Sequence, residues 1–384
     1  MIPFTFRTTP LIVSEPGATA RIGALMAERG CQKVAFVTDE TILSLGLARE
    51  ALDGLGRAGV EAWVFSGVEA DPPEAVVLEA ARGARAARID GVVSVGGGSA
   101  MDTAKLVAVL AASDQPLGEM FGVDRVRGAR LPLALAPTTA GTGSEVTPIA
   151  IVTTAGDEKM GVVSPRLLPD AAVLDAELTL GLPAPVTAAT GVDAMVHAIE
   201  AYTSKRLKNP VSDALAREAL RLLASNIRAA CHAPGDRDAR GAMLLGAALA
   251  GMAFANAPVA AVHALAYPLG GRFHIPHGLS NALVLPHVAA FNRPKAEALY
   301  ADLAPLLVPD LARAPRAERA EGLIAALAAL GPELGLPSRL SALGVSEGHL
   351  PTLARDAMRQ TRLLVNNPRE MTEDDALAIY RAAL

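Results

Sequence analysis

In residues 91–110, GVVSVGGGSAMDTAKLVAVL, the chain passes from an apolar strand through three glycines into a helix. Glycines at the start of a helix let an anion approach the free backbone N–H groups closely. Ser99 and Asp102 have the spacing of a capping box at this helix start. A glycine-rich turn with a helix cap would explain the same residues without a ligand. The glycine spacing is not that of the Rossmann G-x-G-x-x-G fingerprint.

Alternating strands and helices surround this segment. Apolar strands are predicted at KVAFV (33–37), EAWVF (61–65) and LPLALAP (131–137), and helices are predicted from about Thr41 to Ala58 and from Pro73 to Ala87. Three shorter segments predict a hairpin and a closing strand: Ile149–Thr154, Gly161–Ser164 and Ala172–Leu174. Such alternation predicts an α/β domain, with a parallel sheet covered by helices on both faces.

The pattern changes beyond Asp175, where Pro183 and Pro185 interrupt the chain. Nearly everything that follows has helical periodicity, in segments at Val186–Thr203, Val211–Ala229, Arg240–Phe254, Leu279–Phe291 and an amphipathic Ala312–Ala329. We therefore expect two domains, an α/β domain over residues 1–180 and an all-helical domain over residues 181–384.

Composition limits the classes of function. The 384 residues are 51% hydrophobic and carry a net charge of −5, which argues against a nucleic-acid partner. Two cysteines are too few for a disulfide framework. No signal peptide is recognisable, which favours the cytoplasm. The uncharged stretch 241–271 resembles a membrane span, but its Asn256, Pro258 and His263 favour a buried helix pair and no membrane partner.

Two segments of the helical half carry the residue types of a metal site. In GVDAMVHAIEAYTS (191–204), Asp193 and His197 are four residues apart, so a helix points both side chains at one spot. HALAYPLGGRFHIPHG (263–278) adds His263 and His277, with His274 nearby. One carboxylate with up to three imidazoles suits Fe(II) or Zn(II) better than Mg(II) or Ca(II). Any one of these histidines alone would more simply be an ordinary core or surface residue.

Polar residues follow two other predicted strands. PTTAGTGSEVT (137–147) follows the strand that ends near Pro137, and parallel strands would place this loop at the same sheet edge as the glycine turn. The loop could hold the polar parts of a ligand or serve only as a connection. Asp39 follows the first strand, where an acidic side chain could bind a ribose diol and repel a 2′-phosphate. It could equally cap the helix that starts near Thr41.

Four motifs in order make the chain resemble the iron-containing (group III) alcohol dehydrogenase family: GGGSAMDTAK, PTTAGTGSEVT, GVDAMVHAIEAYTS and HALAYPLGGRFHIPHG. The resemblance runs from about residue 5 to 300 and continues more weakly to the end. It implies a dehydroquinate synthase-like architecture, with a nucleotide-binding α/β domain, a helical domain and an active site in the cleft between them. It also implies that members are often dimers.

By the same resemblance, the metal ligands would be Asp193, His197, His263 and His277. The NAD(P) site would include residues of the family's glycine turn and polar loop, together with three further positions: Gly97, Gly98, Ser99, Asp102, Thr138, Thr139, Thr142, Thr147, Asp39, Lys159 and Leu182. Asp39 would favour NAD. The chain departs from many relatives at Tyr267, where a further histidine would stand near the substrate. Tyr267 and His274 are therefore the candidates for proton transfer.

The predicted activity is hydride transfer between NAD(H) and an alcohol, aldehyde or ketone, assisted by Fe(II), with Zn(II) as the alternative metal. A homodimer is expected, as is a small-molecule substrate. Two enzyme alternatives share the architecture: a metal-independent maleylacetate-reductase-like keto acid reductase, and a lyase resembling dehydroquinate synthase. The first would not need the complete ligand set. A non-catalytic NAD-binding protein is the alternative of another class, and it would not need to keep these ligands.

Overall fold

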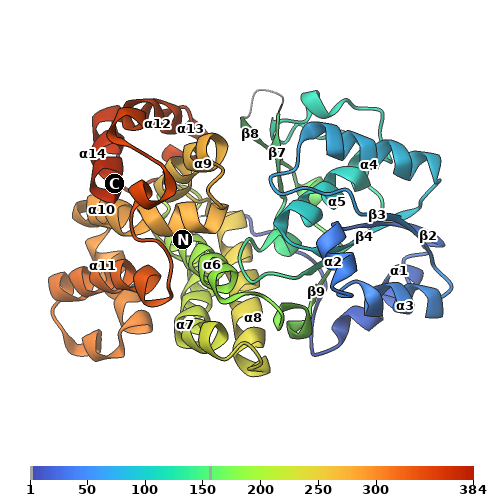
Figure 1. Cartoon of the computed structure of the whole chain (residues 1–384), viewed down its shortest axis with the longest axis horizontal. Helices are drawn as coiled ribbons and strands as arrows, with labels where there is room; N and C mark the ends of the chain where they lie inside the picture. The colour runs from blue at the N-terminus through green and yellow to red at the C-terminus, as the bar shows by residue number, and fades with distance from the viewer. Residues whose placement is uncertain (1–2, 155–157) are drawn as a thin grey trace. The chain divides into compact units, whose positions relative to one another are not determined.

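The computed structural model describes residues 3–154 and 158–384, which form two compact units. One unit spans Arg7–Gly181. The other spans Leu182–Leu384 together with the N-terminal segment that ends at Phe6. In Figure 1 the first unit contains the labelled strands and the helices beside them, and the second unit consists of packed helices.

A six-stranded sheet forms the centre of the first unit, and every neighbouring pair in it is parallel. Its order is β1-β9-β6-β4-β2-β3, which requires crossover connections. The strands are β1 (Ile12–Ser14), β2 (Lys33–Val37), β3 (Glu61–Phe65), β4 (Gly91–Gly96), β6 (Leu133–Pro137) and β9 (Ala171–Leu174). The predicted parallel α/β sheet is confirmed.

Helices cover both faces of this sheet because alternate side chains along a strand point to opposite faces. In β2, Val34 and Phe36 belong to the apolar core under α1 and α3, whereas Ala35 and Val37 belong to the core under α4 and α5. Figure 1 shows the two helical layers on either side of the strands. These helices are α1 (Ile22–Ala27), α2 (Glu40–Ser44), α3 (Arg49–Arg57), α4 (Glu74–Ala86) and α5 (Gly98–Leu110).

Two details of the first unit differ from the sequence prediction. The helix expected from Thr41 to Ala58 is two helices, α2 and α3, because the chain turns at Gly46 with a φ of 72°. The expected closing strand, β9, lies inside the sheet, and the short β1 that was not predicted forms the edge beside it. The hairpin is confirmed.

That hairpin belongs to a separate small sheet. Its strands β7 (Ile149–Thr153) and β8 (Lys159–Val163) pair in antiparallel register, and β5 (Gly122–Val123) adds a third strand beside β8. Buried Ala150, Val152 and Val162 join the core that also contains α5. The small sheet is thereby packed against the helix that follows the glycine turn.

All the regular elements among the described residues of the second unit are helices, as expected. Its longer helices are α6 (Ala184–Thr203), α7 (Pro210–His232), α8 (Arg237–Asn256), α9 (Ala261–Phe273), α10 (His277–Leu307) and α11 (Arg316–Glu333), followed by α12 (Leu350–Met358), α13 (Thr361–Leu364) and α14 (Glu373–Ala383). The prediction for α10 was too short, because the helix continues beyond Phe291 through Pro294 and Pro305. Packing against α6, α9, α11 and α14 offsets the backbone hydrogen bonds that the prolines remove.

The uncharged stretch 241–271 lies in α8 and α9. Among the described residues no single helix has both the length and the apolar character of a membrane span, although α8 and α9 together pass on composition. These two helices meet at an angle of 107°, and most of their side chains are buried. The predicted buried helix pair agrees with this packing.

Candidate metal centre

One face of α6 carries a row of buried acidic and imidazole side chains. Asp193, His197 and Glu200 are separated by four and three residues, so they lie along one side of the helix. Each is at most 4% exposed. Nε2 of His197 lies 3.9 Å from Oδ1 of Asp193, which is the close approach expected from their spacing.

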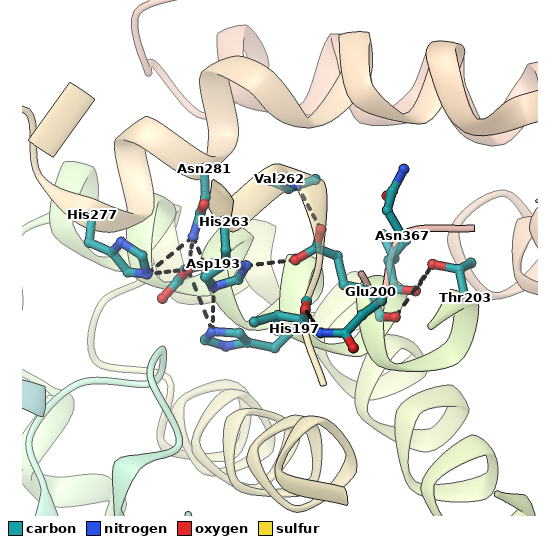
Figure 2. A network of polar contacts seen from close by, with 12 residues as sticks. Asp193, His197, Glu200, Thr203, Val262, His263, His277, Asn281 and Asn367 are labelled. Atoms are coloured by element: carbon teal, nitrogen blue, oxygen red, sulfur yellow. Dashed lines mark hydrogen bonds and ion pairs between the residues drawn. The ribbon is translucent and has the colours of Figure 1, made fainter. Parts of the chain in front are cut away.

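Helices α9 and α10 bring the other two imidazoles to the same place. Nε2 of His263 lies 3.0 Å from Nε2 of His197, and Nε2 of His277 lies 3.7 Å from Oδ1 of Asp193. The potential ligand atoms of Asp193, His197, His263 and His277 all lie within 4.8 Å of one another (Figure 2). The four side chains predicted to bind a metal therefore converge, and their N/O donor set fits Fe(II) or Zn(II).

A glycine lets the start of α10 approach α6 closely enough to bring His277 into this group. A Cβ atom added at Gly278 would lie 2.4 Å from the backbone oxygen of Ala189 and 3.3 Å from Cβ of Asp193. Real Cβ atoms do not make contacts as short as the first of these. The absent side chain at residue 278 is therefore part of the geometry that places His277 beside Asp193.

Glu200 supports His263 from outside the group. Its Oε2 lies 2.7 Å from Nδ1 of His263, and its Oε1 accepts the backbone N–H of Val262 at 2.7 Å. A carboxylate behind a histidine holds the proton on Nδ1 and leaves the Nε2 lone pair for a metal. Burial raises the pKa of Glu200 to about 7. The sequence prediction missed Glu200, although its place three residues after His197 on the same helix face was a usable signal.

The electrostatics favour a neutral His263 and a charged Asp193. Burial, followed by repulsion from His197 and His277, lowers the pKa of His263 well below its ordinary value. Burial alone would raise the pKa of Asp193, but the surrounding imidazoles and the amide of Asn281 hold it below its ordinary value. A metal ion binds these deprotonated forms, a carboxylate and an imidazole lone pair.

The predicted proton-transfer candidates lie in different surroundings. The ring of Tyr267 lies 6.5 Å from that of His263 and 6.0 Å from that of His277, measured between centroids. Phe254 stacks on His197 at 4.4 Å. His274 is exposed and ends α9 in the left-handed conformation, and the convergent group does not include it. Tyr267 is therefore beside the ligands, and His274 is not among them.

The two polar loops of the first unit meet at one sheet edge, as predicted. Gly96 at the end of β4 pairs with Pro137 at the end of β6, so the glycine turn and the loop 138–147 start side by side. A Cβ atom at Gly98 would lie 2.8 Å from a side-chain carbon of Thr142, so the loops touch. Gly97, Gly98 and Thr139 are partly exposed at this edge.

The capping box at this edge is a wrong prediction. Helix α5 begins at Gly98, its N-cap is Gly97, and no described side chain caps it. Oγ of Ser99 instead accepts the backbone N–H of Asp71 at 3.2 Å. The carboxylate of Asp102 accepts from Ser144 Oγ at 2.6 Å and from the N–H of Ile151 at 2.9 Å. The box fails because both side chains have tertiary partners, and no side chain of residues 3–154 or 158–384 caps the first turn of α5.

A buried lysine organises the space behind the loops. Nζ of Lys105 donates to Ser144 Oγ at 2.7 Å, to Thr147 Oγ1 at 3.1 Å and to the backbone oxygen of Ile149 at 2.6 Å, and lies 3.4 Å from Asp102. Burial lowers its pKa, which Asp102 opposes. Thr147 and Thr138 are also buried, at 2% and 3% exposure. Lys105 was not predicted, because its partners come from distant loops.

The remaining predicted cofactor residues are dispersed over the first unit and the start of the second. Oδ1 of Asp39 accepts the N–H of Ile42 at 3.0 Å, so Asp39 does cap α2. Nζ of Lys159 pairs with Asp71 at 2.6 Å, which ties β8 to the segment that contacts Ser99. Leu182 is partly exposed and begins the second unit. The helix cap uses only Oδ1, so the other carboxylate oxygen of Asp39 takes no part in it.

Family models match both halves of the chain. The model for iron-containing alcohol dehydrogenase covers residues 9–176, and the model for the C-terminal part of the Fe-containing alcohol dehydrogenase family covers residues 187–384. The chain belongs to the iron-containing alcohol dehydrogenase family. It is therefore an oxidoreductase of the alcohol dehydrogenase type.

Individual members of the iron-containing alcohol dehydrogenase family are similar to this chain over nearly their whole length. Long-chain-alcohol dehydrogenase 1 of Geobacillus thermodenitrificans is 39% identical over 96% of this chain and 93% of its own. The 1,3-propanediol dehydrogenase of Klebsiella pneumoniae is 38% identical over 96% of this chain and 95% of its own. A crystal structure of a 1,3-propanediol oxidoreductase superposes with a TM-score of 0.97 at 36% identity, covering both chains completely.

A further solved member was crystallised with a cofactor. Sulfoacetaldehyde reductase from Bifidobacterium kashiwanohense, in complex with NAD+, matches 100% of this chain and 99% of its own with a TM-score of 0.88 and 28% identity. The α/β unit, the helical unit and the alcohol dehydrogenase activity predicted from the sequence are thus confirmed for this chain.

Proposed function

We propose that this alcohol dehydrogenase uses one divalent metal ion held by Asp193, His197, His263 and His277, with Fe(II) as the ion. The observation that carries the proposal is the convergence of these four ligand atoms within 4.8 Å. The choice of Fe(II) rests on the family, because Zn(II) would bind such ligands more tightly on intrinsic affinity. Bound there, the ion would act as a Lewis acid toward the oxygen of the substrate.

The protein's own residues prepare this chemistry. Glu200 fixes the proton of His263 on Nδ1, and burial lowers the pKa of His263, so its Nε2 lone pair is available without losing a proton first. Phe254 covers one face of His197 at 4.4 Å, which excludes water from that side. Tyr267 offers a hydroxyl near His263 and His277, and we assign it hydrogen bonding to substrate rather than the role of a base.

We propose NAD as the hydride carrier, bound at the glycine turn. The uncapped first turn of α5 supplies free N–H groups for a pyrophosphate, and Gly97 and Gly98 leave room for it. Asp39 at the end of β2 supplies a negative charge for the ribose diol and against a 2′-phosphate. Asp102 and Thr147, which we also assign to the cofactor site, both contact Nζ of Lys105 behind this turn.

The substrate class we propose is a small primary alcohol and its aldehyde. Relatives are named for methanol, 1,3-propanediol, lactaldehyde and sulfoacetaldehyde, at 33–38% identity. That range indicates that the surroundings of the metal, and not its ligands, set the specificity. We further propose a homodimer in the cytoplasm, which light scattering of the purified protein and cell fractionation would test.

Anaerobic purification followed by metal analysis and a substrate panel tests the proposal. We expect one iron per chain and NADH formation with primary alcohols or diols. The panel should include aldehydes and a keto acid in the reverse direction. A protein that reduces the keto acid at full rate without metal would instead be a maleylacetate-reductase-like enzyme.

A further inference from the structure

The carboxamide of Asn281 faces the convergent ligand atoms. Its Nδ2 lies 2.6 Å from Oδ1 of Asp193 and 3.3 Å from Nε2 of both His263 and His277. Asn281 stands one turn after His277 on α10 and is fully buried. Figure 2 shows the amide pointing from α10 into the group. One donor group therefore contacts three of the four atoms that converge.

The chemistry of an amide nitrogen shows whether the ligand atoms beside it are hydrogen-bond donors or acceptors. Nδ2 carries two hydrogens and no lone pair, so its neighbours must be acceptors. Oδ1 of Asp193, the nearest neighbour, then accepts one of these hydrogens. Nε2 of His263 and of His277 share the other, so each presents a lone pair while its ring proton sits on Nδ1. For His263 a second contact agrees, because its Nδ1 lies 2.7 Å from Oε2 of Glu200.

The orientation of this amide carries a cost. Oδ1 of Asn281 is buried and has no hydrogen-bond partner among residues 3–154 and 158–384. Leaving a buried acceptor unsatisfied costs about 1–3 kcal/mol. The reverse orientation would place two acceptor oxygens, one from Asn281 and one from Asp193, 2.6 Å apart. The contacts of Nδ2 with the ligand atoms therefore decide which way the amide points.

We propose that Asn281 is a positioning residue that holds Asp193, His263 and His277 in their metal-binding form before the ion arrives. Glu200 orients His263 from outside the group, and Asn281 orients three ligand atoms from inside it. Such partners of metal ligands typically contribute about 10–100-fold to metal affinity. This inference rests on the proposed metal centre, and it concerns a residue that contacts the ligands without being one of the four.

Asn281→Leu tests this role, because it keeps the approximate size of the side chain and removes both donor hydrogens. The full-length protein is stripped of metal, and its dissociation constant for Co(II) is measured by competition with a coloured chelator. We expect binding about 10–100-fold weaker than in the wild type. We also expect a changed visible spectrum of the Co(II)-loaded variant, because the ligands are no longer held in place.

Asn292→Leu is the matched control on the same helix. Asn292 is also buried, and it exchanges amide hydrogen bonds of 2.9 and 2.7 Å with Asn367. This variant should lose thermal stability but keep the wild-type affinity for Co(II) and the wild-type spectrum. Equal losses of Co(II) affinity in the two variants would overturn the inference, as would wild-type affinity in Asn281→Leu.

Two further outcomes are distinguishable. A wild type that binds no Co(II) would overturn the proposed metal centre itself. If Asn281→Leu does not fold, nitrogen NMR of the histidine rings in the metal-free wild type decides the question. We expect Nε2 of His263 and of His277 to be without a proton, and a proton on either nitrogen would overturn the inference.

Discussion

Asp39 combines a structural contact with a charge at the carboxyl end of β2. Its Oδ1 caps α2 through the N–H of Ile42 at 3.0 Å. Asp39→Asn keeps such a cap, because asparagine is as good an N-cap as aspartate, but it removes the charge. Two negative charges about 4 Å apart repel by about 1–4 kcal/mol near a protein surface or in water. We expect the wild type to prefer NAD over NADP by about tenfold or more, and Asp39→Asn to narrow that preference.

The preference is measured as the ratio of kcat/KM values for the two cofactors. Asp236→Asn is the control, since Asp236 caps α8 through Ala239 in the same way and should leave the ratio unchanged. A wild type that uses NADP as well as NAD would show that Asp39 serves only as a helix cap.

Tyr267 lies beside the ligands, with its ring 6.5 Å from that of His263. A phenol titrates near about 10 in water and an imidazole near about 6.5, so a phenol is a poor base at neutral pH. Tyr267→Phe removes only the hydroxyl and keeps the ring that lies 6.0 Å from His277. We expect turnover within about tenfold of the wild type, less than the 10²–10⁴-fold of a general acid or base. A larger loss of kcat with metal still bound would make the hydroxyl catalytic.

At the scale of elements, the packing of α10 against α6 determines where His277 lies. Gly278→Ala would place a Cβ atom 2.4 Å from the backbone oxygen of Ala189, so one helix must move. Such overpacking typically costs about 1–3 kcal/mol. We expect lower thermal stability and weaker metal binding together, because the shift separates His277 from Asp193. Calorimetry on metal-stripped and metal-reloaded protein measures both the thermal stability and the metal affinity.

Gly331→Ala is the control for this substitution. Gly331 lies in α11, and a Cβ atom there would meet nothing within 4 Å. Replacing an unstrained helical glycine by alanine stabilises by about 0.4–1 kcal/mol. This variant should therefore melt higher and bind metal normally. Unchanged metal affinity in Gly278→Ala would show that the α6–α10 distance does not control the site.

Several elements could be predicted from local pattern, and others depended on distant neighbours. The strands around β4 and the helix face with Asp193 and His197 follow from hydrophobic period and spacing. The break at Gly46 was missed because glycine inside a helical pattern is often tolerated. The continuation of α10 through Pro294 was missed because proline usually ends a helix unless tertiary packing offsets the loss.

The same division holds in the site. The side chains that carry the chemistry were recognisable by type, and the structure brings Asp193, His197, His263 and His277 together. The residues that support them could not be recognised from the sequence, because Asn281 and Lys105 gain their roles from contacts with segments far away in the sequence. Whether the four bind metal, and whether the glycine turn binds NAD, stay predictions.

At the scale of the whole molecule, Glu145 should give the stability a pH dependence. It is 1% exposed, its Oε2 has no hydrogen-bond partner among the described residues, and burial raises its pKa from 4.5 to about 7. Between pH 4.5 and about 7 the folded chain keeps a proton that the unfolded chain has lost, so the free energy of unfolding falls over this range and levels off once both states have lost the proton. Glu145→Gln should remove this decline.

The Glu145→Gln variant should be more stable than the wild type at about pH 8, by at most about 3 kcal/mol. Melting temperatures of both proteins from about pH 5 to about pH 8 would check this. Glu79→Gln, at an exposed position on α4, should leave the wild-type profile unchanged. Parallel profiles for wild type and Glu145→Gln would show that Glu145 does not lose its proton in this range.

Metal dependence of turnover tests the proposed function most directly. The wild-type protein is stripped with a chelator, assayed for alcohol-dependent NADH formation, and then titrated anaerobically with Fe(II) and, separately, with Zn(II). We expect the stripped protein to be inactive and activity to return in proportion to bound Fe(II), reaching its maximum at one ion per chain. Full activity in the stripped protein would contradict a metal centre at Asp193, His197, His263 and His277.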